Sequence, residues 1–125
     1  MSSADYATDA PWPTELKLNK AKDELSVTFD DGNSFQLPAE MLRVMSPSAE
    51  VQGHSEAERK TVPGKKHVKI DKIEPVGNYA VKIAFDDRHD TGLFSWGLLY
   101  QLGSEKEQRW GQYLNELADK GLTRE

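Results

Sequence analysis

The feature that most constrains the fold of this chain is a strict alternation of apolar and polar residues in its second half. The apolar positions are Tyr79, Val81, Ile83 and Phe85. Successive side chains of a strand point to opposite faces, so this period of two predicts a strand that buries one face. Asp87 and Arg88 then form a tight turn, and a short apolar run over 91–94 predicts the strand back.

Helix signals follow these strands. Ser95 stands where an N-cap would open a short helix over 96–102, which Gly103 would end. Ser104 has a glutamate three residues later, the spacing of a capping box, which predicts a second helix that ends at Gly121. The predicted inner face of this helix carries Trp110, Tyr113, Leu114, Leu117 and Ala118.

The N-terminal half predicts another hairpin. Apolar residues alternate with polar ones over 25–29, and the turn signal at 31–33 is Asp-Gly-Asn, in which glycine and asparagine accept positive φ. The return strand covers 35–37. Pro38 would then open a short helix over 39–44, since the first helical turn tolerates a missing N–H.

Shorter apolar runs predict further strands at 16–18 and 68–70, the latter followed by a bulge near Asp71 and Lys72. Residues 46–67, between the short helix at 39–44 and the strand at 68–70, predict a long loop that is either functional or mobile. These elements together indicate an α+β fold. It would combine a small, mainly antiparallel sheet with short helices and a C-terminal amphipathic helix.

Composition excludes several classes of protein. The 125 residues allow one domain, with a disordered tail at 1–13, a body at 14–103, and a C-terminal helix and tail at 104–125. The absence of cysteine excludes disulfides, zinc–thiolate sites and cysteine nucleophiles, and a net charge of −5 argues against nucleic-acid binding. No apolar run approaches the roughly 20 residues that span a bilayer, and the acidic N-terminus is not a signal peptide. We therefore expect a cytoplasmic monomer.

Several short motifs, in order and spacing, resemble those of a known family. They are Asp31-Gly32, Leu42-Arg43, Val76-Gly77-Asn78-Tyr79, Asp87 with His89, and Gly92 with Ser95-Trp96. Over residues 14–103 the chain resembles the small domain at the N-terminus of gamma-butyrobetaine hydroxylase, which also occurs alone in bacteria as a domain of unknown function. The resemblance implies an accessory role, since this domain is also found attached to P-loop ATPases that handle iron–sulfur clusters. It does not imply oxygenase activity, because the hydroxylase's catalytic domain is absent.

The same resemblance implies a zinc site that this sequence has lost. In the hydroxylases, three cysteines after the Leu-Arg pair and the histidine of an Asp-Gly-His turn hold a structural zinc. By position the cysteines fall on Ser46, Ser48 and Val51, and only His89 remains. Neutral hydroxyls are poor zinc ligands and valine is none, so we predict no structural zinc and no cofactor. Arg88 replaces the family's usual glycine, which costs about 1 kcal/mol if the position has positive φ.

Two polar clusters have more than one interpretation. The His-x-acid motif at His54, with His89, superficially matches the ligands of non-haem iron oxygenases, which need a larger barrel to aim them. The acidic turn is either a cation or acid–base site or a polar turn whose carboxylates accept backbone N–H bonds. Its members are Asp86, Asp87, His89 and Asp90. If Glu50 and His54 fold back over this turn, His54, His89 and a carboxylate would form a weak metal site.

Arg43 also has two interpretations. It either pairs with a carboxylate such as Asp87 or Glu50, replacing the zinc as a clasp between loop and turn, or it is a solvated helix arginine. We interpret the basic stretch 59–69 as a solvated loop.

These observations favour a non-enzymatic interaction or accessory module with a degenerate zinc site and a protein partner. The alternative is a weak metal-binding accessory protein that uses His54 and His89 and is linked to iron or iron–sulfur metabolism. No phosphate loop or nucleophile elbow points to an enzyme. The candidate surface comprises Arg43, Ser46, Ser48, Glu50, His54, Asp87, His89, Asp90 and Trp96.

Overall fold

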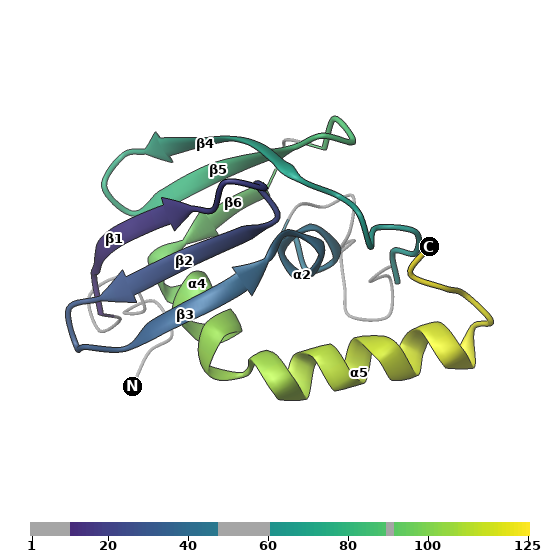
Figure 1. The fold of residues 1–125 in the computed structure, drawn as a ribbon. Coiled ribbons are helices and arrows are strands. Elements are labelled where there is room, and N and C mark those ends of the chain that lie inside the picture. The colour runs from purple at the N-terminus through teal and green to yellow at the C-terminus, as the bar shows by residue number, and fades with distance from the viewer. Residues whose placement is uncertain (1–10, 48–60, 90–91) are drawn as a thin grey trace.

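A computed structural model of the protein describes residues 11–47, 61–89 and 92–125 (Figure 1). Its strands form two three-stranded antiparallel sheets, with strand orders β1-β2-β3 and β4-β5-β6. The predicted α+β class is therefore confirmed, although the strands divide between two sheets. In chain order the elements are β1 (Pro13–Leu18), β2 (Glu24–Phe29), β3 (Ser34–Pro38), α2 (Ala39–Val44), β4 (Ile70–Val76), β5 (Ala80–Phe85), β6 (Gly92–Ser95), α4 (Trp96–Ser104) and α5 (Lys106–Asp119).

The first sheet is built around the predicted hairpin of β2 and β3. Gly32 has a φ of 90°, and the Asp31 carboxylate accepts from the Asn33 backbone N–H at 2.9 Å, which closes the turn. Strand β1 pairs with the other edge of β2 and begins at Pro13, one residue inside the predicted tail.

The second sheet contains the predicted bulge, where the register of β4 against β5 shifts between Ile70 and Lys72. The expected start of β5 at Tyr79 was wrong. The strand begins at Ala80, and Tyr79 lies in the preceding turn with its side chain 48% exposed instead of on the buried face.

One hydrophobic core joins the two sheets and the helices α2 and α4. Its largest fully buried side chains include Phe29 from β2, Phe85 from β5 and Phe94 from β6. Both sheets thus direct their alternating apolar residues toward the same interior. Contacts of Arg43 with Asp87 and of Ser46 with His89 place the turn that follows β5 beside the end of α2.

Helix α4 begins as predicted and ends later than predicted. The Ser95 side chain accepts from Leu98 N at 3.1 Å, as an N-cap does. The helix then runs through Gly103 to Ser104, whose hydroxyl donates to the Gln101 carbonyl. The predicted capping box at Ser104 is therefore wrong. Helix α5 instead has Glu105 at its N-cap position, and among the described residues the Glu105 side chain caps no backbone N–H of the helix.

Helix α5 packs on its own chain and uses a narrower apolar face than predicted. Tyr113 and Leu117 are buried with Val44 at the end of α2, whereas Leu114 is 39% exposed and Ala118 is also exposed. The helix ends at Asp119, before Gly121, which has a φ of 65°. The chain then returns toward the segment that precedes β4 (Figure 1).

Candidate functional site

The turn that joins β5 to β6 carries its acidic residues toward the end of α2. Hydrogen bonds from Phe85 N to His89 O at 2.9 Å and from Arg88 N to Phe85 O at 3.0 Å close the turn. Arg88 has a φ of 74°. The positive φ that the family's glycine suggests is therefore present, at a cost to arginine of about 1 kcal/mol.

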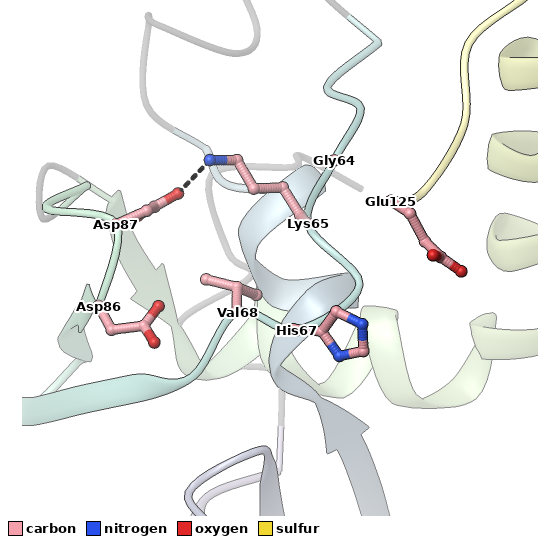
Figure 2. A pocket seen from close by; sticks show the side chains of 7 residues that line it. All are labelled: Gly64, Lys65, His67, Val68, Asp86, Asp87 and Glu125. Atoms are coloured by element: carbon pink, nitrogen blue, oxygen red, sulfur yellow. Dashed lines mark ion pairs between the residues drawn. The ribbon is translucent and has the colours of Figure 1, made fainter.

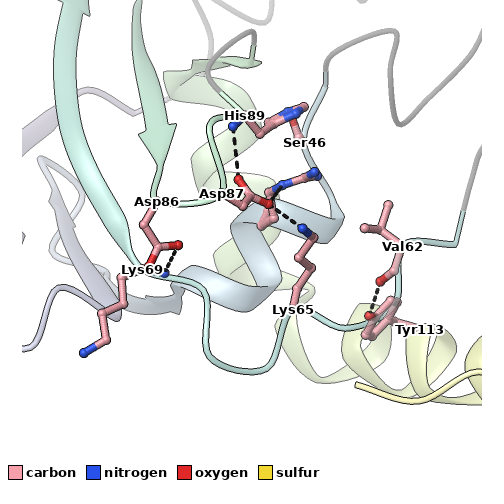
Figure 3. Close-up of polar contacts among 9 residues, drawn as sticks. Ser46, Val62, Lys65, Lys69, Asp86, Asp87, His89 and Tyr113 are labelled. Carbon is pink, nitrogen blue, oxygen red and sulfur yellow. Dashed lines mark hydrogen bonds and ion pairs between the residues drawn. The ribbon is translucent and has the colours of Figure 1, made fainter. Parts of the chain in front are cut away.

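Asp87 lies at the centre of a charge cluster (Figure 3). Its Oδ2 accepts from Arg43 Nε at 2.7 Å and from Lys65 Nζ at 2.6 Å. Its Oδ1 accepts from the His89 backbone N–H at 3.1 Å. We call Asp87, Arg43 and Lys65 the Asp87 clasp, since they join the turn to α2 and to segment 61–66. Arg43 is therefore paired with a carboxylate, that of Asp87, and is not a solvated helix arginine.

The three side chains of the Asp87 clasp are largely withdrawn from water. The exposed fraction of the side chain is 19% for Asp87, 12% for Arg43 and 23% for Lys65. Burial alone raises the pKa of Asp87, but hydrogen bonds from Lys65, from the His89 N–H and from Arg43 outweigh burial and lower the pKa from 3.8 to about 2. The carboxylate therefore stays ionised at neutral pH, between two cations.

Arg43 is only partly satisfied in this cluster. Its Nη1 is buried and has no hydrogen-bond partner within the part of the chain that the structure describes. An unsatisfied buried donor costs about 1–3 kcal/mol, which offsets part of what the ion pair contributes. Arg43 therefore contributes less to stability than its short contact with Asp87 suggests.

A second polar contact joins the same elements beside the clasp. Ser46 Oγ and His89 Nε2 are 3.0 Å apart and share a hydrogen bond, with Ser46 fully buried and His89 only 6% exposed. A Cβ on Gly92 would lie 2.5 Å from Ser46 Oγ, so only glycine allows β6 to pass this close. The structure thus brings together two of the four positions that hold zinc in the hydroxylases.

The residues at this contact do not fit a tetrahedral zinc. A zinc between a thiolate and an imidazole would hold sulfur and nitrogen about 3.6 Å apart, given bond lengths of about 2.3 and 2.0–2.1 Å. Ser46 and His89 instead lie at the distance of a direct hydrogen bond, and a neutral hydroxyl is a poor zinc ligand. Among residues 11–47, 61–89 and 92–125, no three His, Cys, Asp or Glu side chains converge on a position that could hold a metal ion.

The serine and the histidine of this contact are both buried. Phe94 and Pro47 stand within 3.1 and 3.4 Å of the position that a Cβ on Gly92 would occupy beside Ser46. The Ser46 hydroxyl is therefore closely surrounded on the side of β6.

Segment 61–66 holds the residues that the sequence analysis missed. Lys65 was interpreted as part of a solvated loop, yet it is part of the Asp87 clasp. The segment is fixed from the other side by α5, because the Tyr113 hydroxyl donates to the Val62 carbonyl. No periodic pattern marks this segment, so only the Pro63-Gly64 turn signal distinguished it.

An open depression of about 290 Å³ lies beside the clasp, between the turn, segment 61–66 and the C-terminus (Figure 2). Most of the residues that line it are polar or charged and Val68 is the apolar one, yet more of the exposed surface of the depression is apolar than polar. The residues that line it are Gly64, Lys65, His67, Val68, Asp86, Asp87 and Glu125. Asp86 is held in place because its Oδ1 accepts from the Lys69 backbone N–H at 3.1 Å (Figure 3).

Of the remaining residues of the candidate surface, the structure describes Trp96, which is not part of the Asp87 clasp. Trp96 stands at the start of α4, where its indole N–H donates to the Asn78 carbonyl at 2.8 Å and braces the turn between β4 and β5. Four predicted residues lie outside the described residues: Ser48, Glu50, His54 and Asp90. The weak metal site that combines His54 with His89 therefore stays a prediction.

Among the described residues, no helix is both long enough and apolar enough to cross a membrane.

Comparison with known proteins relates the chain to proteins of similar fold. Residues 16–100 match the protein family described as gamma-butyrobetaine hydroxylase-like, N-terminal. A search of curated proteins finds no match.

Three solved structures illustrate this similarity. One solution structure determined by NMR is 46% identical over 93% of this chain and 91% of the other, with a TM-score of 0.81. A second is 49% identical over 94% of this chain and 87% of the other, with a TM-score of 0.80. A crystal structure from Acidithiobacillus ferrooxidans, of a protein of unknown function in the DUF971 family, is 33% identical. It covers 83% of this chain and 100% of the other, with a TM-score of 0.62.

Proposed function

The chain belongs to the gamma-butyrobetaine hydroxylase-like, N-terminal family, and from this premise we propose that it is a small, non-enzymatic interaction module of the cytoplasm. In this proposal, direct polar contacts have replaced the family's zinc. The observation that carries the proposal is the buried hydrogen bond between Ser46 and His89, at 3.0 Å. It joins the end of α2 to the β5–β6 turn, the two places that zinc joins in the hydroxylases.

The Asp87 clasp supports this proposal with charge. It joins the same two elements and adds segment 61–66 through Lys65. A structural zinc ties loops together without chemistry of its own, and a buried, hydrogen-bonded ion pair can perform the same task. The turn and the adjoining segment are therefore kept in a defined shape, as a binding surface requires.

The depression beside the clasp is the surface that we assign to a partner. Asp86, His67 and Glu125 border it, and the exposed Glu125 side chain is already paired with Lys66 at 3.2 Å. The carboxylates of Asp86 and Glu125 would favour a partner that carries complementary charge. We therefore expect a protein partner that presents a charged segment, held by contacts that salt weakens.

A comparison of surface variants tests the interaction. His67 is exposed on the wall of the depression, so His67→Glu should change the surface without disturbing the core. Lys17→Ala on β1, also exposed, is the matched control. We expect proteins cross-linked to the wild type at its native locus to be recovered with Lys17→Ala and lost with His67→Glu.

Two results would contradict the proposal. One is recovery of the same proteins with His67→Glu as with the wild type. The other is calorimetric binding of Zn²⁺ or Fe²⁺ to the chelator-treated protein, tighter than about millimolar, that depends on His54 and His89. This second result would establish the metal-binding alternative in place of the interaction module.

A further inference from the structure

Residues 123–125 are tied back onto the body of the protein by a partly buried ion pair, in which the Arg124 side chain is 38% exposed. Arg124 donates from Nε to one oxygen of Glu40 at 2.9 Å and from Nη2 to the other at 2.7 Å. The Glu40 side chain is only 7% exposed, and the Arg124 guanidinium also stacks 5.4 Å from the centre of the Trp110 ring. Bidentate, partly desolvated pairs of this kind are stronger than exposed ones.

The same residues pair with segment 61–66 through their backbone. Gly64 N donates to the Thr123 carbonyl at 3.0 Å, and Lys66 N donates to the Arg124 carbonyl at 2.9 Å. These two bonds hold the backbone on either side of Lys65. Figure 2 shows the Lys65 side chain directed to Asp87, away from Glu125.

We propose that residues 123–125 form a latch, closed by the Arg124–Glu40 pair, that holds segment 61–66 in the register from which Lys65 reaches Asp87. Opening the latch would remove the backbone partners of Gly64 and Lys66 and free Lys65 from Asp87. The C-terminus and the β5–β6 turn are therefore coupled through one irregular segment. This coupling is a property of the chain itself and does not depend on whether a partner binds.

Arg124→Ala tests the latch by backbone amide exchange, measured by NMR. We expect the Gly64 and Lys66 amides to exchange on the order of tenfold faster than in the wild type, while the core amide of Ile83 is unchanged, as for a local opening. A carboxyl titration of the same variant should show the pKa of Asp87 rising from about 2 toward 3.8, as Lys65 is released.

Arg109→Ala is the control, because it also removes an arginine that pairs with a glutamate, Glu105 at 2.8 Å, outside the latch. It should leave Gly64, Lys66 and Asp87 as in the wild type. Wild-type exchange of Gly64 and Lys66 in Arg124→Ala would overturn the proposal. Equally faster exchange of the Ile83 amide would also overturn the proposal, because it would show that Arg124 acts only on the stability of the whole fold.

A second variant tests the coupling in the opposite direction. Coupling between two sites is reciprocal, so breaking the clasp with Asp87→Asn must also loosen the latch. We expect faster exchange of the Lys66 amide in this variant, and Arg124→Lys, which keeps the charge but loses the bidentate geometry, should show an intermediate rate. A latch that is unchanged in Asp87→Asn would refute the coupling even if Arg124→Ala failed to fold.

Discussion

Replacing Asp87 with asparagine removes the carboxylate that Arg43 and Lys65 share. The difference between a pKa of 3.8 and one of about 2 corresponds to about 2.4 kcal/mol. Solvent screening of these partly exposed groups reduces this to about 1–2 kcal/mol. The two cations left close together add some repulsion, so we expect Asp87→Asn to lower the free energy of unfolding by about 2 kcal/mol and Tm by roughly 6–10 °C.

Arg43→Met should cost much less, although it breaks the same ion pair. Asp87 keeps Lys65 and the His89 N–H, and the buried, unsatisfied Nη1 of Arg43 disappears. Methionine retains most of the length and apolar volume of the arginine stem. We expect a loss below about 1 kcal/mol, because relief of the unsatisfied donor offsets the lost hydrogen bond.

The effect of pH follows from the depressed pKa of Asp87. A carboxyl group whose pKa is lower in the folded state stabilises the fold above its unfolded pKa of 3.8, and this contribution is lost as pH falls toward about 2. The difference in stability between the wild type and Asp87→Asn should therefore be constant near neutral pH. It should shrink over this acidic window.

Urea denaturation of both variants, at several pH values and with unchanged m-values, measures these differences. Arg43→Met serves as the control for loss of the ion pair alone. The reasoning is refuted if Asp87→Asn is as stable as the wild type at neutral pH. It is equally refuted if Arg43→Met costs as much as Asp87→Asn.

Three further predictions concern backbone and packing. Gly92→Ala should lower the free energy of unfolding by about 1–3 kcal/mol in urea denaturation, because the new Cβ would lie 2.5 Å from Ser46 Oγ. Gly111→Ala should instead raise it by about 0.5–1 kcal/mol, because a Cβ there has nothing within 4 Å and alanine favours the helix. Equal effects of the two substitutions would contradict the close packing at Gly92. Arg88→Gly should raise Tm, since it relieves a φ of 74° worth about 1 kcal/mol, and a lower Tm would show that the turn is not strained. Burial, followed by the nearby negative charge of Glu40, raises the pKa of Tyr113 from 10.0 to about 12. Stability should therefore fall between these pH values, with Tyr113 titrating late in the ultraviolet spectrum, and titration of all four tyrosines near pH 10 would contradict this.

Much of the sheet structure follows from local signals in the sequence. The alternation in β2 and β5, the glycine turn at Gly32 and the N-cap at Ser95 each act over a few residues, and each is present in the structure. Such signals are readable because the period of a strand and the geometry of a turn depend on neighbouring residues.

Gly103 shows where local signals fail. We predicted that it ends the helix, whereas the helix passes through it to Ser104. A Cβ at this position would lie 2.2 Å from the Phe35 ring, so glycine is needed there for close packing of α4 on β3. A glycine that allows close approach and a glycine that ends a helix are identical in the sequence, and only the tertiary structure distinguishes them.

The site was predictable in part. The resemblance to a zinc-binding family identified Ser46 and His89 as neighbours of a common centre, and the structure places them in contact. Lys65 and Arg124 could not be found in this way, because their partners lie far along the chain and neither residue belongs to a periodic pattern. Irregular segments fixed by long-range contacts carry little local signal.

The spacing of these contacts along the chain has a consequence for how the protein folds and unfolds. The partners are 43 residues apart for Ser46 and His89, and 84 residues apart for Arg124 and Glu40. Closing such long loops costs entropy before the contacts form, so the clasp and the latch should be absent from the transition state for folding, whereas the hairpins are local. Variants of these contacts should then unfold faster while refolding at nearly the wild-type rate. The clasp and the latch would then slow unfolding and prolong the lifetime of the folded protein, without guiding the folding pathway.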